Sequence, residues 1–251
     1  MSQAPPRPPL SAYVISSIRF VLIICSTVSI SLALALTPQA RTGLRAWLLR
    51  AWGRSLTWLM GLSLSQEGAP PREGMIMIAN HTSYADIPIL MGVRACSFLA
   101  KAEVARWPVI GWGARVAGTV FVDRSSPESR VASREELKRR VNAGAMILVF
   151  SEGTTTPRGV VEPLKPGMFH EAASARVPIQ LVSLEYGDDG DAWVGDDPLW
   201  PHFVWVFGRL KTNARLCYRA ALLEGDDGHA LAEEAERWLK GEAARASSSS
   251  G

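Results

Sequence analysis

A histidine and an aspartate five positions apart, His81 and Asp86, are the residues of this sequence whose types and spacing best suit catalysis. They belong to the heptapeptide NHTSYAD, residues 80–86, which directly follows the apolar run Met75–Ala79. The apolar run predicts a buried strand, and the residues after it predict the start of a helix. At such a corner the carboxylate can fix the tautomer of the imidazole while the other ring nitrogen takes a proton from a hydroxyl.

A structural interpretation of the same pair is a corner histidine beside a carboxylate that caps a helix. His-x4-Asp is short and arises easily by chance, so it needs support from the rest of the chain. A metal site is disfavoured, because there is no His-Glu-x-x-His and a third ligand would have to come from far along the chain. A serine-hydrolase site is disfavoured too, since neither Ser83 nor Ser151 lies in a Gly-x-Ser-x-Gly elbow.

A second motif, FSEGT at residues 150–154, closes another strongly apolar run that begins at residue 146. Gly153 permits a close backbone approach or a positive φ, and Glu152 stands where the carboxyl ends of strands usually host ligands. Glu152 is a candidate either for binding an acceptor hydroxyl or for bracing the loop. The backbone N–H groups around Gly153 and Thr154 are candidates for stabilising an oxyanion.

Two cations near predicted strand ends are candidates for binding a phosphate group. Arg124 ends the segment GTVFVDR, residues 118–124, and Lys101 lies in AKAE, residues 100–103. Guanidinium and ammonium groups pair well with phosphate. For Lys101, a solvated surface charge is an equally good interpretation.

The elements that must position these residues alternate along the chain from residue 75 onward. Helices and strands that alternate predict an α/β fold with a mostly parallel sheet flanked by helices. The linker GAPPREG, residues 68–74, suggests three parts: anchoring helices over 1–67, the α/β domain over 68–246 and a disordered tail over 247–251. Strands are predicted at 75–79, 97–100, 118–122, 146–150, 179–186 and 214–220, and helices at 84–93, 127–142, 169–175 and 230–244.

The first part of the chain predicts a membrane anchor. Residues 12–36 are strongly apolar, and residues 20–36 carry no charge. As a helix the uncharged stretch would be about 25 Å long, a little short of the hydrocarbon thickness of a bilayer, so it either spans with help from its flanks or dips into one leaflet. A cleaved signal peptide is the competing interpretation, but LALTP at residues 34–38 is a poor cleavage site.

A second helix with interleaved arginines and tryptophans should follow, on the membrane surface. Tryptophan rings prefer the head-group region, where guanidinium groups pair with phosphate, and positive charge after an apolar segment favours the cytoplasmic side. The alternative is a core helix with solvated arginines. The residues concerned are Arg41, Arg45, Arg50, Arg54, Trp47, Trp52 and Trp58.

Composition excludes several other classes of protein. The 251 residues are 47% hydrophobic and 20% charged, and the net charge of +3 is too small to indicate nucleic-acid binding. The three cysteines are far apart and form no Cys-x-x-Cys pair, so they indicate neither a disulfide framework nor a zinc site. Reduced thiols in a cytoplasm-facing protein are the expectation.

Four segments in this order, NHTSYAD, GTVFVDR, FSEGT and the VPI of residues 177–179, resemble the glycerolipid acyltransferase superfamily, in particular the bacterial 1-acylglycerol-3-phosphate acyltransferases. The resemblance covers residues 75–185 and implies transfer of an acyl group from acyl-CoA or acyl-carrier protein to the free hydroxyl of a lysolipid. It implies His81 as general base and Asp86 as the residue that orients it. The expected acceptor is 1-acylglycerol-3-phosphate, giving phosphatidic acid.

The resemblance also implies no cofactor beyond the thioester co-substrate, no metal, membrane lipids as partners, and a place on the cytoplasmic face of the inner membrane. Two rivals remain. One is a non-catalytic lipid-binding protein on the same fold, and the other is a lysophospholipase or thioesterase that uses water as acceptor.

One departure from the family motif bears on the acceptor. The motif is commonly Phe-Pro-Glu-Gly-Thr-Arg-Ser, and here Ser151 replaces the proline and Thr155 replaces the arginine. Arg158, three residues on, is a candidate substitute for that cation. Without such a cation, the resemblance extends to acyltransferases of other lysolipids, such as lyso-ornithine lipid acyltransferases. The sequences of those enzymes resemble this one in the EGTT stretch. The aromatic residues between 187 and 208 have three open interpretations: a cover for the acyl groove, a membrane contact, or core.

Overall fold

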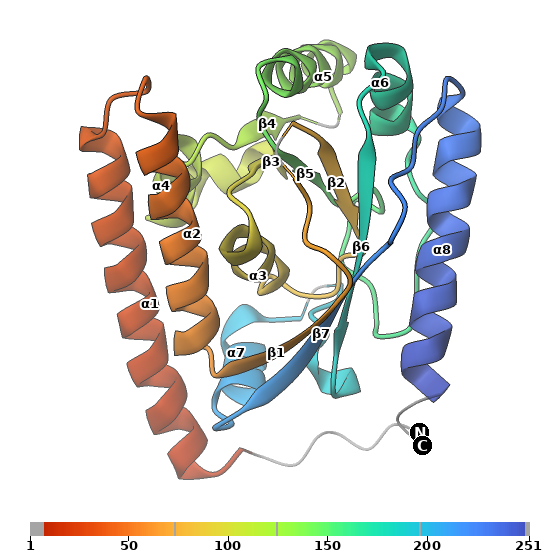
Figure 1. Ribbon diagram of the computed structural model, residues 1–251. Coiled ribbons are helices and arrows are strands. Elements are labelled where there is room, and N and C mark those ends of the chain that lie inside the picture. The colour runs from red at the N-terminus through yellow and green to blue at the C-terminus, as the bar shows by residue number, and fades with distance from the viewer. Residues whose placement is uncertain (1–7, 73, 124, 196, 249–251) are drawn as a thin grey trace.

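The computed structural model describes residues 8–248 except 73, 124 and 196, and a seven-stranded sheet crosses it in the order β1-β7-β6-β2-β5-β3-β4 (Figure 1). Among the pairings described, only that of β6 with β7 is antiparallel. The expected α/β fold with a mostly parallel sheet is confirmed. The strands are β1 Leu62–Glu67, β2 Ile76–Ala79, β3 Ser97–Lys101, β4 Val120–Val122, β5 Ile147–Val149, β6 Ile179–Tyr186 and β7 Thr212–Tyr218.

Helices cover both faces of the sheet. In Figure 1 the pair α1 and α2 stands on one side of the strands and α8 on the other. The first side carries α1 Leu10–Leu36, α2 Thr42–Leu59, α3 Asp86–Val93 and α7 Leu199–Phe207, with α4 Ile110–Val116 beside α1. The second side carries α5 Pro127–Asn142, α6 Gly167–Ala175 and α8 Gly228–Ser248, and the short 3₁₀ helices are η1 Ala102–Arg106 and η2 Asp189–Asp191.

The central strands β2 and β5 are buried on both faces, which explains their continuous apolar sequences. In β2, Met77 and Ala79 pack into one core cluster with α2 and α3, whereas Ile76 and Ile78 pack into a second cluster with α5, α6 and α8. A strand of this kind has no polar face, so its sequence does not alternate.

The N-terminal helices form a hairpin against the first face. Among the described residues α1 alone is long and apolar enough to cross a membrane, by length and composition. It packs on α2, α4 and α7 through a stripe that includes Ala12, Ser16 and Thr27. Its other side exposes apolar side chains, such as Val14 and Ile18, to the surroundings.

Several features differ from the sequence-based expectation at the element level, and the helix α4 is one that was not predicted. The strand β1 was not predicted; it lies in the stretch 1–67 that was assigned to anchoring helices, and it forms the edge of the sheet beside β7. In the aromatic segment 187–208, α7 buries Phe203 and Phe207 in the core, while Trp200 is exposed and packs edge-on against Phe20 of α1. The helix α8 runs to Ser248, so the first two residues of the predicted tail are helical, and residues 249–251 lie outside the described residues.

Candidate active site

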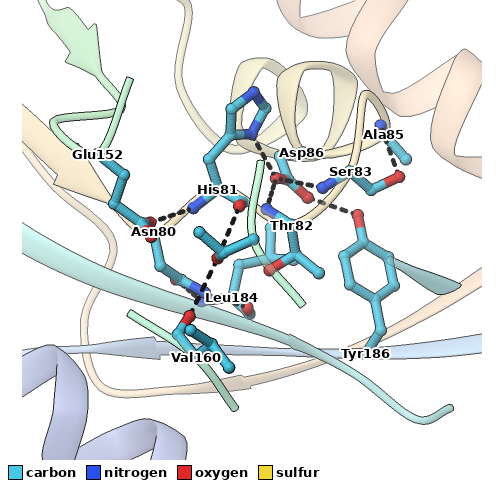
Figure 2. Close-up of polar contacts among 11 residues, drawn as sticks. Asn80, His81, Thr82, Ser83, Ala85, Asp86, Glu152, Val160, Leu184 and Tyr186 are labelled. Carbon is cyan, nitrogen blue, oxygen red and sulfur yellow. Dashed lines mark hydrogen bonds and ion pairs between the residues drawn. The ribbon is translucent and has the colours of Figure 1, made fainter. Parts of the chain in front are cut away.

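Three neighbouring parallel strands deliver the candidate site to one edge of the sheet. The strand β2 lies between β5 and β6 and is parallel to both, so their carboxyl ends meet. His81 follows β2, Glu152 follows β5, and Tyr186 ends β6. Figure 2 shows these side chains gathered around the start of α3.

The expected contact between the two catalytic candidates is present. His81 Nδ1 lies 2.8 Å from Asp86 Oδ2, and the Asp86 side chain is fully buried at the first residue of α3. The backbone N–H groups of Thr82 and Ser83 donate to the same oxygen at 2.8 and 2.9 Å. An ionised carboxylate only accepts, so Nδ1 carries the ring proton and Nε2 keeps a lone pair.

The other ring nitrogen is available for chemistry. Within the described part of the chain, Nε2 of His81 has no hydrogen-bond partner, and Figure 2 shows it pointing away from Asp86. The His81 side chain is 18% exposed. Its ring stacks on Phe150, with the ring centroids 3.9 Å apart and the planes 13° from parallel. Asp86 therefore holds one edge of the imidazole and Phe150 holds one face, while the lone pair of Nε2 can accept from a substrate hydroxyl.

Tyr186 is a site residue that the sequence motifs do not include; it was predicted only as the end of a strand. Its hydroxyl donates to Asp86 Oδ1 at 2.6 Å from a buried position. Burial raises the pKa of Tyr186 well above its ordinary value, so the hydroxyl stays protonated and remains a donor. The available signal was a phenol at the end of a predicted buried strand, because a buried tyrosine hydroxyl needs a partner.

We expect Tyr186→Phe to weaken the dyad without touching substrate. Asp86 Oδ1 would lose its donor, at a cost of about 1–3 kcal/mol in the free energy of unfolding. The looser carboxylate should lower kcat about tenfold, a loss of about 1.4 kcal/mol in transition-state stabilisation, with both KM values unchanged. Thermal unfolding and steady-state kinetics measure the two effects.

Tyr218 gives a matched control for this variant. It is also buried, but its hydroxyl has no hydrogen-bond partner in the described structure. Tyr218→Phe should therefore leave kcat unchanged. Equal kinetic effects of the two substitutions would show that the Tyr186 hydroxyl has no special role.

Glu152 ties the loop after β5 to the catalytic corner. Its Oε1 accepts the His81 backbone N–H at 2.8 Å, and its Oε2 accepts the N–H of Glu162 at 3.0 Å. The Thr156 N–H donates to the His81 carbonyl oxygen at 2.8 Å. Burial raises the pKa of Glu152. Two roles were considered for this carboxylate, binding an acceptor hydroxyl and bracing the loop. These hydrogen bonds match the second role.

The two candidates for an oxyanion donor differ in their hydrogen bonding. Gly153 has a φ of +80°, and its N–H donates to the Phe150 carbonyl oxygen at 3.1 Å. That donor is engaged in a tight turn. Thr154 is exposed, and its N–H has no partner among the residues that the structure describes. Thr154 is therefore the better candidate of the pair.

Two of the candidate phosphate-binding cations, Lys101 and Arg158, lie among the described residues. Lys101 is exposed at the end of β3, which is separated from β2 by β5. Arg124 lies outside the described residues. Arg158, the candidate substitute for the missing motif arginine, places Nη1 3.1 Å from Asp189 Oδ1. Its charge is therefore already paired with a carboxylate.

The loop after β6 supports the catalytic corner from the other side. The Trp193 N–H donates to the Thr82 carbonyl oxygen at 2.9 Å. His202 lies 3.1 Å from the Tyr84 hydroxyl through Nδ1 and 2.9 Å from the Ala192 carbonyl oxygen through Nε2. Because a carbonyl accepts, Nε2 is the donor and Nδ1 accepts from the hydroxyl. Burial lowers the pKa of His202, which favours this neutral form.

Comparisons with known proteins agree on one kind of enzyme. Residues 63–185 match the model of the Acyltransferase family. The lyso-ornithine lipid O-acyltransferase of Pseudomonas aeruginosa is 35% identical, over 79% of this chain and 79% of that protein. The 1-acyl-sn-glycerol-3-phosphate acyltransferase of Neisseria meningitidis is 30% identical, over 52% of this chain and 51% of that protein. The crystal structure of the 1-acyl-sn-glycerophosphate acyltransferase of Thermotoga maritima has the same fold, with a TM-score of 0.69, 24% identity and 94% of each chain covered.

Proposed function

Because the chain belongs to the glycerolipid acyltransferase superfamily, we propose that it transfers a fatty acyl group from acyl-CoA or acyl-carrier protein to the hydroxyl of lyso-ornithine lipid. The observation that carries the proposal is the dyad. His81 Nδ1 lies 2.8 Å from the buried Asp86 carboxylate, which leaves Nε2 as the ring nitrogen that can act as a base. No metal or organic cofactor is required by this chemistry.

The proposed reaction needs one base and no covalent enzyme intermediate. His81 Nε2 takes the proton of the acceptor hydroxyl while that oxygen attacks the thioester carbonyl carbon. A C–O bond forms, and the carbonyl oxygen becomes an oxyanion. When the tetrahedral intermediate collapses, the C–S bond breaks and the protonated imidazole returns the proton to the thiolate.

Two groups would stabilise the charges that develop. The buried Asp86 carboxylate faces the imidazolium that forms at His81. A preorganised backbone donor at the oxyanion is commonly worth several kcal/mol, and the Thr154 N–H is the donor we propose.

Two local features favour an acceptor without a phosphate monoester. Thr155 stands where the family motif commonly has an arginine, and Arg158 is already paired with Asp189. The head group of an ornithine lipid carries an ammonium and a carboxylate but no phosphate. The similarity to a lyso-ornithine lipid enzyme over 79% of the chain, against 52% for the Neisseria enzyme, supports the same choice.

The function is tested by a comparison of acceptors. Purified protein in detergent is given acyl-CoA or acyl-carrier protein with either lyso-ornithine lipid or 1-acylglycerol-3-phosphate, and products are identified by mass spectrometry. We expect kcat/KM to be about tenfold or more higher for lyso-ornithine lipid, since one missing charge-assisted hydrogen bond to phosphate is worth about 1.5–3 kcal/mol. Thr155→Arg should raise kcat/KM for 1-acylglycerol-3-phosphate and leave kcat/KM for lyso-ornithine lipid nearly unchanged.

The alternatives give different products. A preference for 1-acylglycerol-3-phosphate in the unmodified protein would assign the acceptor that the sequence motifs first suggest, and would overturn the proposal for lyso-ornithine lipid. Free fatty acid without acylated lipid would identify water as the acceptor.

The apolar helix α1 and the family together place the protein at a membrane. We propose the cytoplasmic face of the inner membrane, with α1 in one leaflet rather than across the bilayer. One side of α1 packs along α2, α4 and α7, so only its outer side, with Val14, Ile18 and Val21, is open to lipid. A helix with one protein-facing and one lipid-facing side suits an interfacial position.

A further inference from the structure

We propose that a groove between α2, α3 and β1 binds the phosphate group of an anionic membrane phospholipid. The groove has a volume of about 360 Å³, and three arginines line it: Arg50 and Arg54 of α2, and Arg94 directly after α3. No carboxylate is among the described residues that line it, and Thr57 and Gln66 add polar groups. The inference does not depend on which acceptor the dyad serves.

The Arg50 guanidinium is incompletely satisfied within the described structure. Arg54 donates through Nε to the Gly92 carbonyl oxygen at 3.1 Å, and Arg94 donates through Nε to the Pro71 carbonyl oxygen at 3.1 Å. Arg50 Nε is buried and has no hydrogen-bond partner there. A buried donor without a partner is costly, and a bound phosphate would satisfy it with a charge-assisted hydrogen bond.

Close packing of two helices positions these arginines. A Cβ atom at Gly53 would overlap the backbone nitrogen of Gly92, so glycine lets α2 lie directly against the end of α3. This contact places Arg54 beside the last carbonyl groups of α3, and Arg94 follows that helix directly. The grouping is therefore fixed by backbone contact.

The same surface of α2 indicates a lipid rather than a soluble anion. Trp47, Arg50, Arg54 and Trp58 are spaced by three or four residues and share one side of the helix. Trp47 is 63% exposed and Trp58 is 77% exposed, and Trp58 also lines the groove. Exposed tryptophans prefer the head-group depth of a membrane, which is where lipid phosphates lie.

Other arginines of the hairpin are engaged within the protein. Arg19 donates to the carbonyl oxygens of Phe207 and Arg209, and Arg45 donates to those of Leu34 and Val116. They hold helix ends together, whereas Arg50 and Arg54 have no ion pair in the described structure. Of these four arginines, Arg50 and Arg54 are thus the ones available to a ligand.

The groove is separate from the dyad. Asp86 is the first residue of α3, and the α3 residues that line the groove are Ile89, Gly92 and Val93. Neither His81 nor Asp86 lines it. A phospholipid held at the groove would fix the protein on the membrane without occupying His81 Nε2.

The test measures lipid binding in detergent solution by isothermal titration calorimetry. Short-chain phosphatidylglycerol is titrated into the full-length protein, and phosphatidylcholine of the same chain length, inorganic phosphate and CoA are titrated separately. We expect phosphatidylglycerol to bind and phosphatidylcholine to bind about tenfold or more weakly, because its choline cation would face the arginines. Arg50→Gln/Arg54→Gln should weaken phosphatidylglycerol binding about tenfold or more, as each lost charge-assisted hydrogen bond is worth about tenfold.

Lys138→Gln/Arg139→Gln on α5 removes the same charge from the other side of the sheet and is the matched control. It should leave phosphatidylglycerol binding unchanged. Equal weakening by the two double variants would reduce the effect to net charge and overturn the site. Tighter binding of CoA than of phosphatidylglycerol, lost in Arg50→Gln/Arg54→Gln, would assign the groove to the acyl donor and overturn the lipid proposal.

Discussion

Replacing His81 with alanine is expected to lower kcat by about 10²–10⁴-fold while the protein still folds. The variant removes Nε2, the only nitrogen of the dyad that can take the acceptor proton. The His81 side chain is partly exposed (18%), so the structural losses are its stacking on Phe150 and its hydrogen bond to Asp86. The Asp86 carboxylate keeps its three other donors. Thiol release from acyl-CoA and mass spectrometry of the acylated lipid measure the rate, and thermal unfolding measures the stability.

His229→Ala is the control for this experiment. His229 is exposed on α8, on the opposite side of the sheet from α3, so its loss should leave turnover unchanged. If His81→Ala turned over substrate at the rate of the control, His81 would not be the general base. A purified protein without acyl transfer to any lysolipid would favour the silent lipid-binding alternative.

The parts of the fold that the sequence predicts well are those whose environment is uniform. The strand β6 and the helix α5 have the predicted bounds, 179–186 and 127–142. β6 is buried on both faces and is mostly apolar, although Gln180, Ser183 and Glu185 interrupt it, and Ser126 before α5 accepts from the Ser129 N–H as a helix cap. In both cases the local sequence is enough to predict the element and its bounds.

The missed elements depend on neighbours that the sequence does not reveal. The strand β1 is a short run at the edge of the sheet, and it is a strand because β7 pairs with it. The nine residues of α7 are Pro201, His202 and seven aromatic or aliphatic residues, so its periodicity gave no clear signal, and its burial depends on contact with α1.

The same division holds at the site. His81 and Asp86 are five residues apart, so their contact follows from one local corner. Glu152 binds His81 across 71 residues, and Tyr186 binds Asp86 across 100 residues. Those contacts exist because β2 lies between β5 and β6, and strand order is a property of the whole chain. A sequence motif therefore indicates the base, while its supports need the tertiary structure.

Asp86→Asn is expected to lower kcat by about 10²–10⁴-fold with little change in either KM. The carboxylate accepts from His81 Nδ1, the Thr82 and Ser83 N–H groups and the Tyr186 hydroxyl. If the asparagine oxygen keeps the first three donors, its NH₂ group faces Tyr186, whose hydroxyl can turn to accept. The corner then survives, but the imidazolium at His81 has lost its negative partner.

A double variant decides whether Asp86 acts through His81. If Asp86 acts only by orienting the imidazole and stabilising its protonated form, replacing Asp86 has no further effect on kcat once the ring is gone. His81→Ala/Asp86→Asn should then have the same kcat as His81→Ala, because residues that act as one unit are not additive. Thermal unfolding of all three variants separates a folding defect from a catalytic one. Losses that multiply in the double variant would mean that Asp86 contributes to the reaction independently of the base.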